Sequence, residues 1–145
     1  MQTPHHPDQI SVKVFHNLMF IQFSATRPYP GEYLAGDPIV QVFATTAPAG
    51  SDSCAVCEEV FHLLNVGDDP TFGTPDARAI AYRARGNRSL SVSDLVCVGD
   101  AWYACASTGF DPVPEPRIVS GGWAGSTPHT GVDLPESTGA SAPAV

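Results

Sequence analysis

The sequence predicts an α+β fold, a small and mostly antiparallel β-sheet or partly open barrel with one main helix. Apolar and polar residues alternate in several short segments, one longer segment has an apolar stripe at helical spacing, and Gly- and Pro-rich segments separate them. The chain has 145 residues, 43% of them hydrophobic, which suits a single domain. We expect this domain over residues 10–113, between a disordered N-terminus, residues 1–9, and a flexible tail, residues 114–145.

The first expected strands lie in the N-terminal part of the chain. Residues 10–23 alternate apolar and polar side chains at their start and predict a strand, which a bend near His16 would divide in two. Residues 27–38 are rich in Pro and Gly and predict a loop. Residues 39–46 predict a second strand.

The main helix is expected over residues 53–66. Its apolar side chains fall at spacings of i, i+4, i+5 and i+8, which places them on one face. Ser51 or Asp52 can cap its N-terminus, and Gly67 can end it. The segment 78–85 alternates apolar and other residues and predicts a strand, with a helix as the alternative.

A β-hairpin is expected near the end of the domain. Residues 95–98 and 101–106 predict strands, and Gly99–Asp100 between them suits a two-residue turn. In that register Cys97 and Cys105 lie on opposite faces, so they cannot easily bind one metal ion. The first face is expected to carry Leu95, Cys97, Trp102 and Ala104, and the second Val96, Val98, Tyr103 and Cys105.

The most informative segment is Ser89–Val96, which reads Ser-Leu-Ser-Val-Ser-Asp-Leu-Val. Leu90 and Val92 are apolar at a spacing of two and can point into a core. Ser91 and Asp94 can accept hydrogen bonds from backbone N–H groups in a turn. The segment therefore predicts a turn that leads into the following strand.

This string, followed by Gly99, Tyr103 and Gly109–Phe110, resembles the YodL-like domain. That domain occurs in polyvalent proteins and small accessory proteins of plasmids, conjugative elements and phages. Asn65 would correspond to an upstream Asn of the family pattern, and Leu95 replaces its usual Val. The resemblance implies an accessory role in a mobile element or phage, for instance as an inhibitor in host-defence conflict, and it implies no established activity.

An alternative function, nucleic-acid or nucleotide binding, is based on a cluster of positive charge. Residues 90–96 also resemble a Leu-Ser-Val-(Gly/Ser)-Asp-x-Val pattern of small barrels of the PUA and ASCH type. In those barrels an adjacent cleft binds RNA or a nucleotide. Arginines bind phosphate through paired hydrogen bonds, and aromatic side chains stack on bases. The candidate site consists of Arg78, Arg83, Arg85, Arg88, Ser89, Ser91, Asp94, Trp102 and Tyr103. The simpler alternative is that the arginines pair internally with Asp68, Asp69, Asp76 or Asp94.

The second alternative is a thiol-redox or metal-dependent enzyme. Cys54 and Cys57 form a Cys-x-x-Cys pair at the start of the expected helix, where the helix dipole lowers a thiol pKa. Glu58 and His62 lie one turn apart and could hold a metal ion or transfer a proton. Ordinary thiols and a hydrogen bond on the helix surface are simpler interpretations, so we expect no catalytic residue, no metal and no cofactor.

The charge and hydropathy of the chain indicate the class of partner. A net charge of −8 argues against general nucleic-acid affinity, because neutralising phosphates requires clustered Lys and Arg. No apolar run approaches the roughly 20 residues that span a bilayer, and the first residues do not form a secretory signal. We expect a cytoplasmic, non-enzymatic protein-interaction module that binds a host or element-encoded protein and no membrane. The single lysine, with abundant Ala, Gly and Pro, suggests an actinobacterium or its phage as the source.

Overall fold

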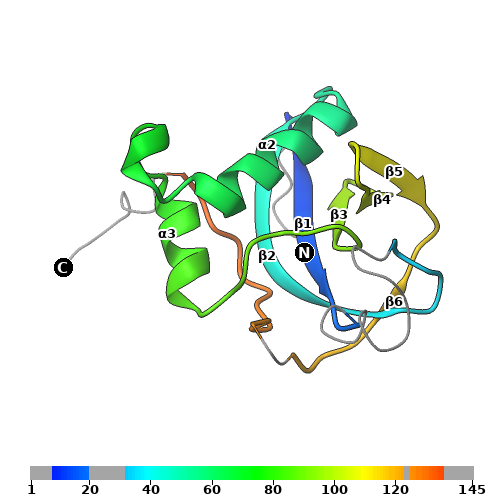
Figure 1. The fold of residues 1–145 in the computed structure, drawn as a ribbon. Coiled ribbons are helices and arrows are strands. Elements are labelled where there is room, and N and C mark those ends of the chain that lie inside the picture. Colours follow the sequence, from blue (N-terminus) through cyan, green and yellow to red (C-terminus); the bar gives the residue numbers. More distant parts are fainter. Residues whose placement is uncertain (1–7, 20–31, 123–124, 136–145) are drawn as a thin grey trace, which may run out of the picture.

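The computed structural model describes residues 8–19, 32–122 and 125–135, and it confirms the predicted α+β fold class. In these residues one mixed sheet of six strands curves into a half-barrel, and two helices cover one of its faces (Figure 1). The strand order is β5-β4-β3-β1-β2-β6, and only β2 and β6 pair in parallel. The strands are β1 (Gln9–Asn17), β2 (Pro38–Pro48), β3 (Leu95–Val98), β4 (Ala101–Cys105), β5 (Phe110–Val113) and β6 (Arg117–Ile118). None of the described helices has the length and hydropathy needed to cross a lipid bilayer.

Strand β1 lies inside the sheet, between β2 and β3, and its pairing with β2 contains a β-bulge. Val14 pairs with Phe43, whereas the next residue, Phe15, pairs with Gln41, so Val42 is the extra residue. Val42 and Phe43 both contribute to the core beneath the helices. Because a bulge bends its strand and increases the local twist, this irregularity contributes to the curvature of the sheet. The strand expected over residues 10–23 ends at Asn17, next to the expected bend, and residues 20–31 lie outside the described residues.

Apolar side chains form a core on each face of the sheet. The helix side contains Val12, Val14, Val40, Val42, Phe43, Val96 and Val98 from the strands. The opposite side contains Phe15, Ile39, Leu95, Cys97 and Ala104, with Trp102 packed against them. The register of the hairpin is as predicted, since Cys97 pairs with Trp102, and Gly99 has the positive φ of 63° that a two-residue turn uses. The two predicted faces of the hairpin are therefore confirmed.

Helix α2 (Ser53–Val66) has the predicted bounds. Asp52 caps it by accepting a hydrogen bond from the backbone N of Ala55 at 2.9 Å. A short 3₁₀ turn, η2 (Pro70–Phe72), leads from α2 to the next helix. The buried side chains of α2, which pack on the sheet, are Val56, Cys57, Val60, Leu63 and Leu64.

The strand predicted over residues 78–85 is wrong, and the alternative, a helix, is correct. Helix α3 (Ala77–Ala84) begins after Asp76, whose side chain accepts a hydrogen bond from the backbone N of Arg78. Ala79 and Tyr82, three residues apart, are buried, whereas Ile80 is 51% exposed. The burial thus follows a helical period, and the alternation in the sequence does not correspond to two faces of a strand.

In the tail expected from residue 114 onward, the described residues 114–122 and 125–135 are part of the folded unit. Strand β6 pairs with β2, and residues 125–135, here called the C-terminal segment, run along the same strand. The backbone N of His129 donates to Gln41 O at 2.9 Å, and that of Asp133 donates to Ala44 O at 2.8 Å. The segment is ordered through backbone hydrogen bonds to a sheet edge, which its Gly- and Pro-rich composition does not reveal. Residues 136–145 and 1–7 lie outside the described residues.

Arg85 joins the bulge to the C-terminal segment. Its Nη2 donates to Val42 O at 3.2 Å and to Asp133 Oδ2 at 3.1 Å. The carbonyl of the extra residue in the bulge is thereby hydrogen-bonded by a charged donor. This contact fixes α3, β2 and the C-terminal segment to one another.

We expect Arg85→Met to lower the free energy of unfolding by about 2 kcal/mol, because both hydrogen bonds from the guanidinium are lost. Urea denaturation followed by circular dichroism measures this change. Arg117→Met is the matched control, since Arg117 is exposed in β6 and its replacement should change stability by less than about 0.5 kcal/mol. Equal stability of the two variants would show that the Arg85 contacts contribute nothing.

Candidate functional site

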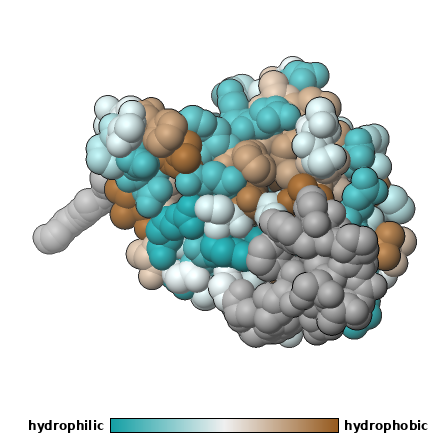
Figure 2. All heavy atoms as spheres, in the orientation of Figure 1, coloured by the Kyte–Doolittle hydropathy of each residue, from teal (hydrophilic) through white to brown (hydrophobic). Residues whose placement is uncertain are grey.

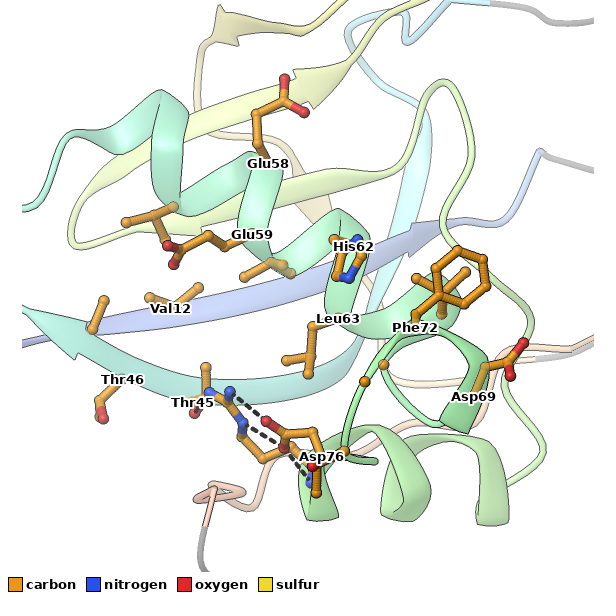
Figure 3. A pocket seen from close by; sticks show the side chains of 18 residues that line it. Val12, Thr45, Thr46, Glu58, Glu59, His62, Leu63, Asp69, Phe72 and Asp76 are labelled. Carbon is orange, nitrogen blue, oxygen red and sulfur yellow. Dashed lines mark hydrogen bonds and ion pairs between the residues drawn. The ribbon is translucent and has the colours of Figure 1, made fainter.

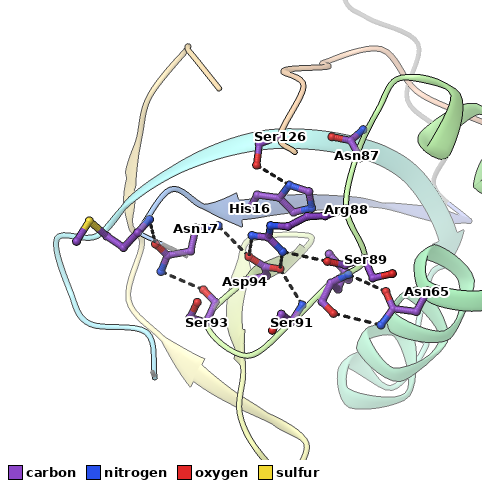
Figure 4. A network of polar contacts seen from close by, with 12 residues as sticks. His16, Asn17, Asn65, Asn87, Arg88, Ser89, Ser91, Ser93, Asp94 and Ser126 are labelled. Atoms are coloured by element: carbon purple, nitrogen blue, oxygen red, sulfur yellow. Dashed lines mark hydrogen bonds and ion pairs between the residues drawn. The ribbon is translucent and has the colours of Figure 1, made fainter. Parts of the chain in front are cut away.

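The segment Ser89–Val96 forms a turn before β3, and Asp94 is the centre of its hydrogen bonds (Figure 4). Asp94 is only 1% exposed. Its carboxylate accepts from Arg88 Nη1 at 2.7 Å and Nη2 at 2.8 Å, from Asn17 N at 2.9 Å and from Ser91 N at 2.8 Å. A buried carboxylate with this many donors is compensated for its lost hydration. The predicted role of Asp94 in satisfying backbone N–H groups is confirmed.

Asn65 connects α2 to the same turn. Its Oδ1 accepts from Leu90 N at 2.7 Å, and its Nδ2 donates to Leu90 O at 3.2 Å. Arg83 adds a contact from α3, because its Nη2 donates to Asn65 O at 3.1 Å and to Ser89 Oγ at 2.6 Å. Both helices are therefore tied to the turn by side chains that the sequence analysis singled out separately.

His16 is fully buried and extends this network toward the C-terminal segment (Figure 4). Its Nε2 lies 2.7 Å from Tyr82 Oη, and its Nδ1 lies 2.8 Å from Ser126 Oγ. Tyr82 donates its single hydroxyl proton to Arg88 O. Nε2 must therefore carry a proton and donate to Tyr82, and Nδ1 accepts from Ser126. His16 is neutral in this arrangement, and burial lowers its pKa from 6.5 to about 4.

Ser93 occupies a strained position in the turn. Its φ is 85°, in the left-handed region that favours glycine, and its buried Oγ has no hydrogen-bond partner among the described residues. Asn17 Nδ2 donates to Ser93 O at 3.3 Å and to Asp37 Oδ2 at 3.0 Å, and so holds this peptide in place. The backbone geometry explains why glycine also suits this position in the Leu-Ser-Val-(Gly/Ser)-Asp shape.

The four clustered arginines do not present one shared phosphate-binding surface. Arg83 and Arg88 contact the Ser89–Val96 turn, whereas Arg78 and Arg85 contact β2. Each arginine has an acidic partner, as the simpler alternative predicts for most of them. The pairs are Arg78–Asp76 at 2.9 Å, Arg83–Asp68 at 4.0 Å, Arg85–Asp133 at 3.1 Å and Arg88–Asp94 at 2.7 Å.

Trp102 and Tyr103 lie on opposite faces of β4. The Trp102 ring packs against Phe15, with 4.9 Å between ring centroids, and Tyr103 packs against the core beneath the helices. Neighbouring bases of a nucleic acid cannot stack on both rings at once. The candidate site residues are therefore divided between a structural network and two faces of the sheet.

Cys57 of the Cys-x-x-Cys pair is a buried thiol with a raised pKa. The structure contains them as free thiols, with Cys54 exposed and Cys57, Cys97 and Cys105 buried. Burial raises the pKa of Cys57 and of Cys105 to about 12, so desolvation outweighs the lowering expected from the helix N-terminus at Cys57. Among the described residues, no group of three or more His, Cys, Asp or Glu side chains is arranged to hold a metal ion.

A groove of about 510 Å³ is a separate feature that the sequence analysis did not find (Figure 3). It lies between α2, the η2 turn, the start of α3 and the end of β2. Figure 2 shows hydrophobic surface at the turn between α2 and α3, beside hydrophilic residues. The floor contains Val12, Val56, Val60, Leu63 and Val66, and the rim contains Glu58, Glu59, His62, Asp69 and Phe72. Since distant segments supply these residues, only the spacing of Glu58 and His62 on one helix signalled part of the groove.

Comparison with protein families, with curated proteins and with solved structures finds no match for this chain. The resemblance of Ser89–Val96 to the YodL-like domain therefore stays a prediction.

We expect Asp94→Asn to lower the free energy of unfolding by about 3–5 kcal/mol, because it leaves the Arg88 guanidinium buried without its counter-charge. Urea denaturation measures the change. Asp100→Asn, in the exposed turn of the hairpin, is the control and should be nearly neutral. A loss below 1 kcal/mol for Asp94→Asn would contradict a central role of this ion pair.

We also expect the free energy of unfolding to fall by about 3 kcal/mol as the pH is lowered from 6.5 to 4. In that interval the unfolded chain binds a proton at His16 and the folded chain does not, because the folded pKa is about 4. Urea denaturation at a series of pH values, for the wild type and His16→Gln, measures the slope. Most of the slope should disappear in His16→Gln and persist in His62→Gln, which alters an exposed residue of α2. An unchanged slope in His16→Gln would refute the assignment.

Proposed function

We propose that this chain is a non-enzymatic binding module that recognises another protein through the groove beside α2. The observation that carries this proposal is the contrast between the buried hydrogen-bond network of Asp94 and the groove beside α2. The side chains around Asp94 are buried and hydrogen-bonded to one another, whereas the groove opens to solvent between exposed rim side chains, with largely buried apolar side chains at its floor. Concave apolar surfaces with a few polar groups at the edge are typical of binding sites.

The charge distribution supports a protein partner rather than a nucleic acid. Glu58, Glu59 and Asp69 line the groove and repel phosphates, and the clustered arginines are engaged in internal ion pairs. Phe72 is 58% exposed at the rim. Exposed aromatic residues are enriched where proteins bind one another, because burying them contributes strongly to affinity.

The resemblance to the YodL-like domain supports a more specific version of this proposal. The chain would be an accessory protein of a mobile element or phage, acting in the cytoplasm on a host or element-encoded protein. Inhibition of a host-defence component is one role consistent with an acidic module that carries a binding groove.

Site-specific photo-crosslinking in the natural host tests the groove directly. With p-benzoylphenylalanine in place of Phe72, we expect a covalent adduct with a host or element-encoded protein, because position 72 is exposed at the rim. The same residue in place of Ile118, which is 49% exposed in β6 and does not line the groove, is the control and should give no such adduct. Identical adduct patterns at the two positions, or none at position 72, would refute the proposal.

A further inference from the structure

We infer that the groove binds a basic segment of its partner protein, with the aliphatic stem of an arginine or lysine on the apolar floor and its charge at the acidic rim. This inference rests on the proposed function, because it names the chemistry of the segment that the module would recognise. The charge balance of the groove, its aromatic rim and its size support it independently.

The groove has an uncompensated negative charge. Four carboxylates line it, together with one arginine, and that arginine is already paired with Asp76 through hydrogen bonds of 2.9 and 3.0 Å. Among the described residues no cation pairs with Glu58, Glu59 or Asp69. In Figure 3 dashed lines lead from the carboxylate of Asp76, whereas none leads from the carboxylates of Glu58, Glu59 or Asp69. A positively charged occupant would therefore supply the cationic partner that Glu58, Glu59 and Asp69 lack among the described residues.

The other properties of the groove suit a long cationic side chain. An arginine or lysine stem can cover apolar surface while its charged end stays near water, as the floor and rim require. Phe72 and His62 meet edge to face, with ring centroids 6.4 Å apart, so one face of the exposed Phe72 ring remains available to a cation. A cavity of about 510 Å³ accommodates one such side chain and its neighbours rather than a whole helix.

Other occupants fit less well. An anionic ligand would meet three carboxylates, and a wholly apolar segment would desolvate them without compensation. Positive charge is therefore the feature that distinguishes the inferred occupant from anionic and wholly apolar ones. Probes that differ only in the charge of one end can test this preference.

The test uses hexylguanidinium, hexylurea and heptanoate, which share an apolar chain and carry positive, no and negative charge. Each is titrated into the full-length ¹⁵N-labelled chain and followed by NMR. We expect hexylguanidinium to shift the amides of His62, Phe72 and Gly73 and to bind about fivefold more tightly than hexylurea, the effect of one exposed ion pair. Heptanoate should leave these amides unchanged, and high salt should weaken the guanidinium binding.

Variants assign the effect to the rim. Glu59→Gln combined with Asp69→Asn should lower the affinity for hexylguanidinium about fivefold, to that of hexylurea. Asn at position 69 can still cap the η2 turn, where Asp69 accepts from Thr71 N at 2.9 Å. Glu115→Gln, at an exposed position that does not line the groove, is the matched control and should bind as the wild type does.

The outcomes separate this inference from the proposed function. Equal binding of hexylurea, equal binding of heptanoate, or no shift with hexylguanidinium would overturn the basic occupant. If position 72 still crosslinks a protein in that case, the binding module stands and only its charge preference is wrong. Guanidinium binding without any crosslink at position 72 would retain the cation site and reject the protein partner.

Discussion

The ion pair between Arg88 and Asp94 supports parts of the chain that are far apart in sequence. The Asp94 carboxylate accepts a hydrogen bond from the backbone N–H of Asn17 at the end of β1. This bond fixes the turn before β3 to the central strands. The backbone of Arg88 adds two connections, since its carbonyl accepts from Tyr82 of α3 and its N–H donates to Gly125 O at 3.0 Å. Buried ion pairs are costly to form, and here the cost is offset because both partners also organise neighbouring backbone.

This network determines where the groove lies without contributing to its surface. Tyr82 and Arg83 hold α3 against the turn, and Asn65 holds the end of α2 against the same turn. The opening between the two helices is thereby set by contacts on their buried sides. The rim side chains of Glu59 and His62 are exposed and take no part in this network, whereas Val60 and Leu63 at the floor also belong to the core. Polar rim residues and core residues therefore alternate along α2, so the rim can be altered without changing the core.

The sequence allowed the local elements of this fold to be predicted, because each depends on neighbouring residues. The cap at Asp52, the hairpin turn at Gly99 and the turn bond from Ser91 to Asp94 are examples. The network of His16 was not predictable, since its partners Tyr82 and Ser126 become neighbours only after folding. The groove was missed for the same reason. The contribution of the C-terminal segment was missed because its hydrogen bonds, from the backbone and from Ser126 and Asp133, reach residues that are distant in sequence.

The C-terminal segment also restricts how this protein can meet others. It occupies hydrogen-bonding groups of β2, and β6 pairs beside it. At the other margin of the sheet, β5 contains Pro112, which has no N–H to offer an incoming strand. An added strand from another molecule would therefore find few backbone groups to bind, and fibre-like growth of the sheet is disfavoured. Recognition at the proposed groove would instead depend on side-chain chemistry, which can change by point mutation while the architecture is retained.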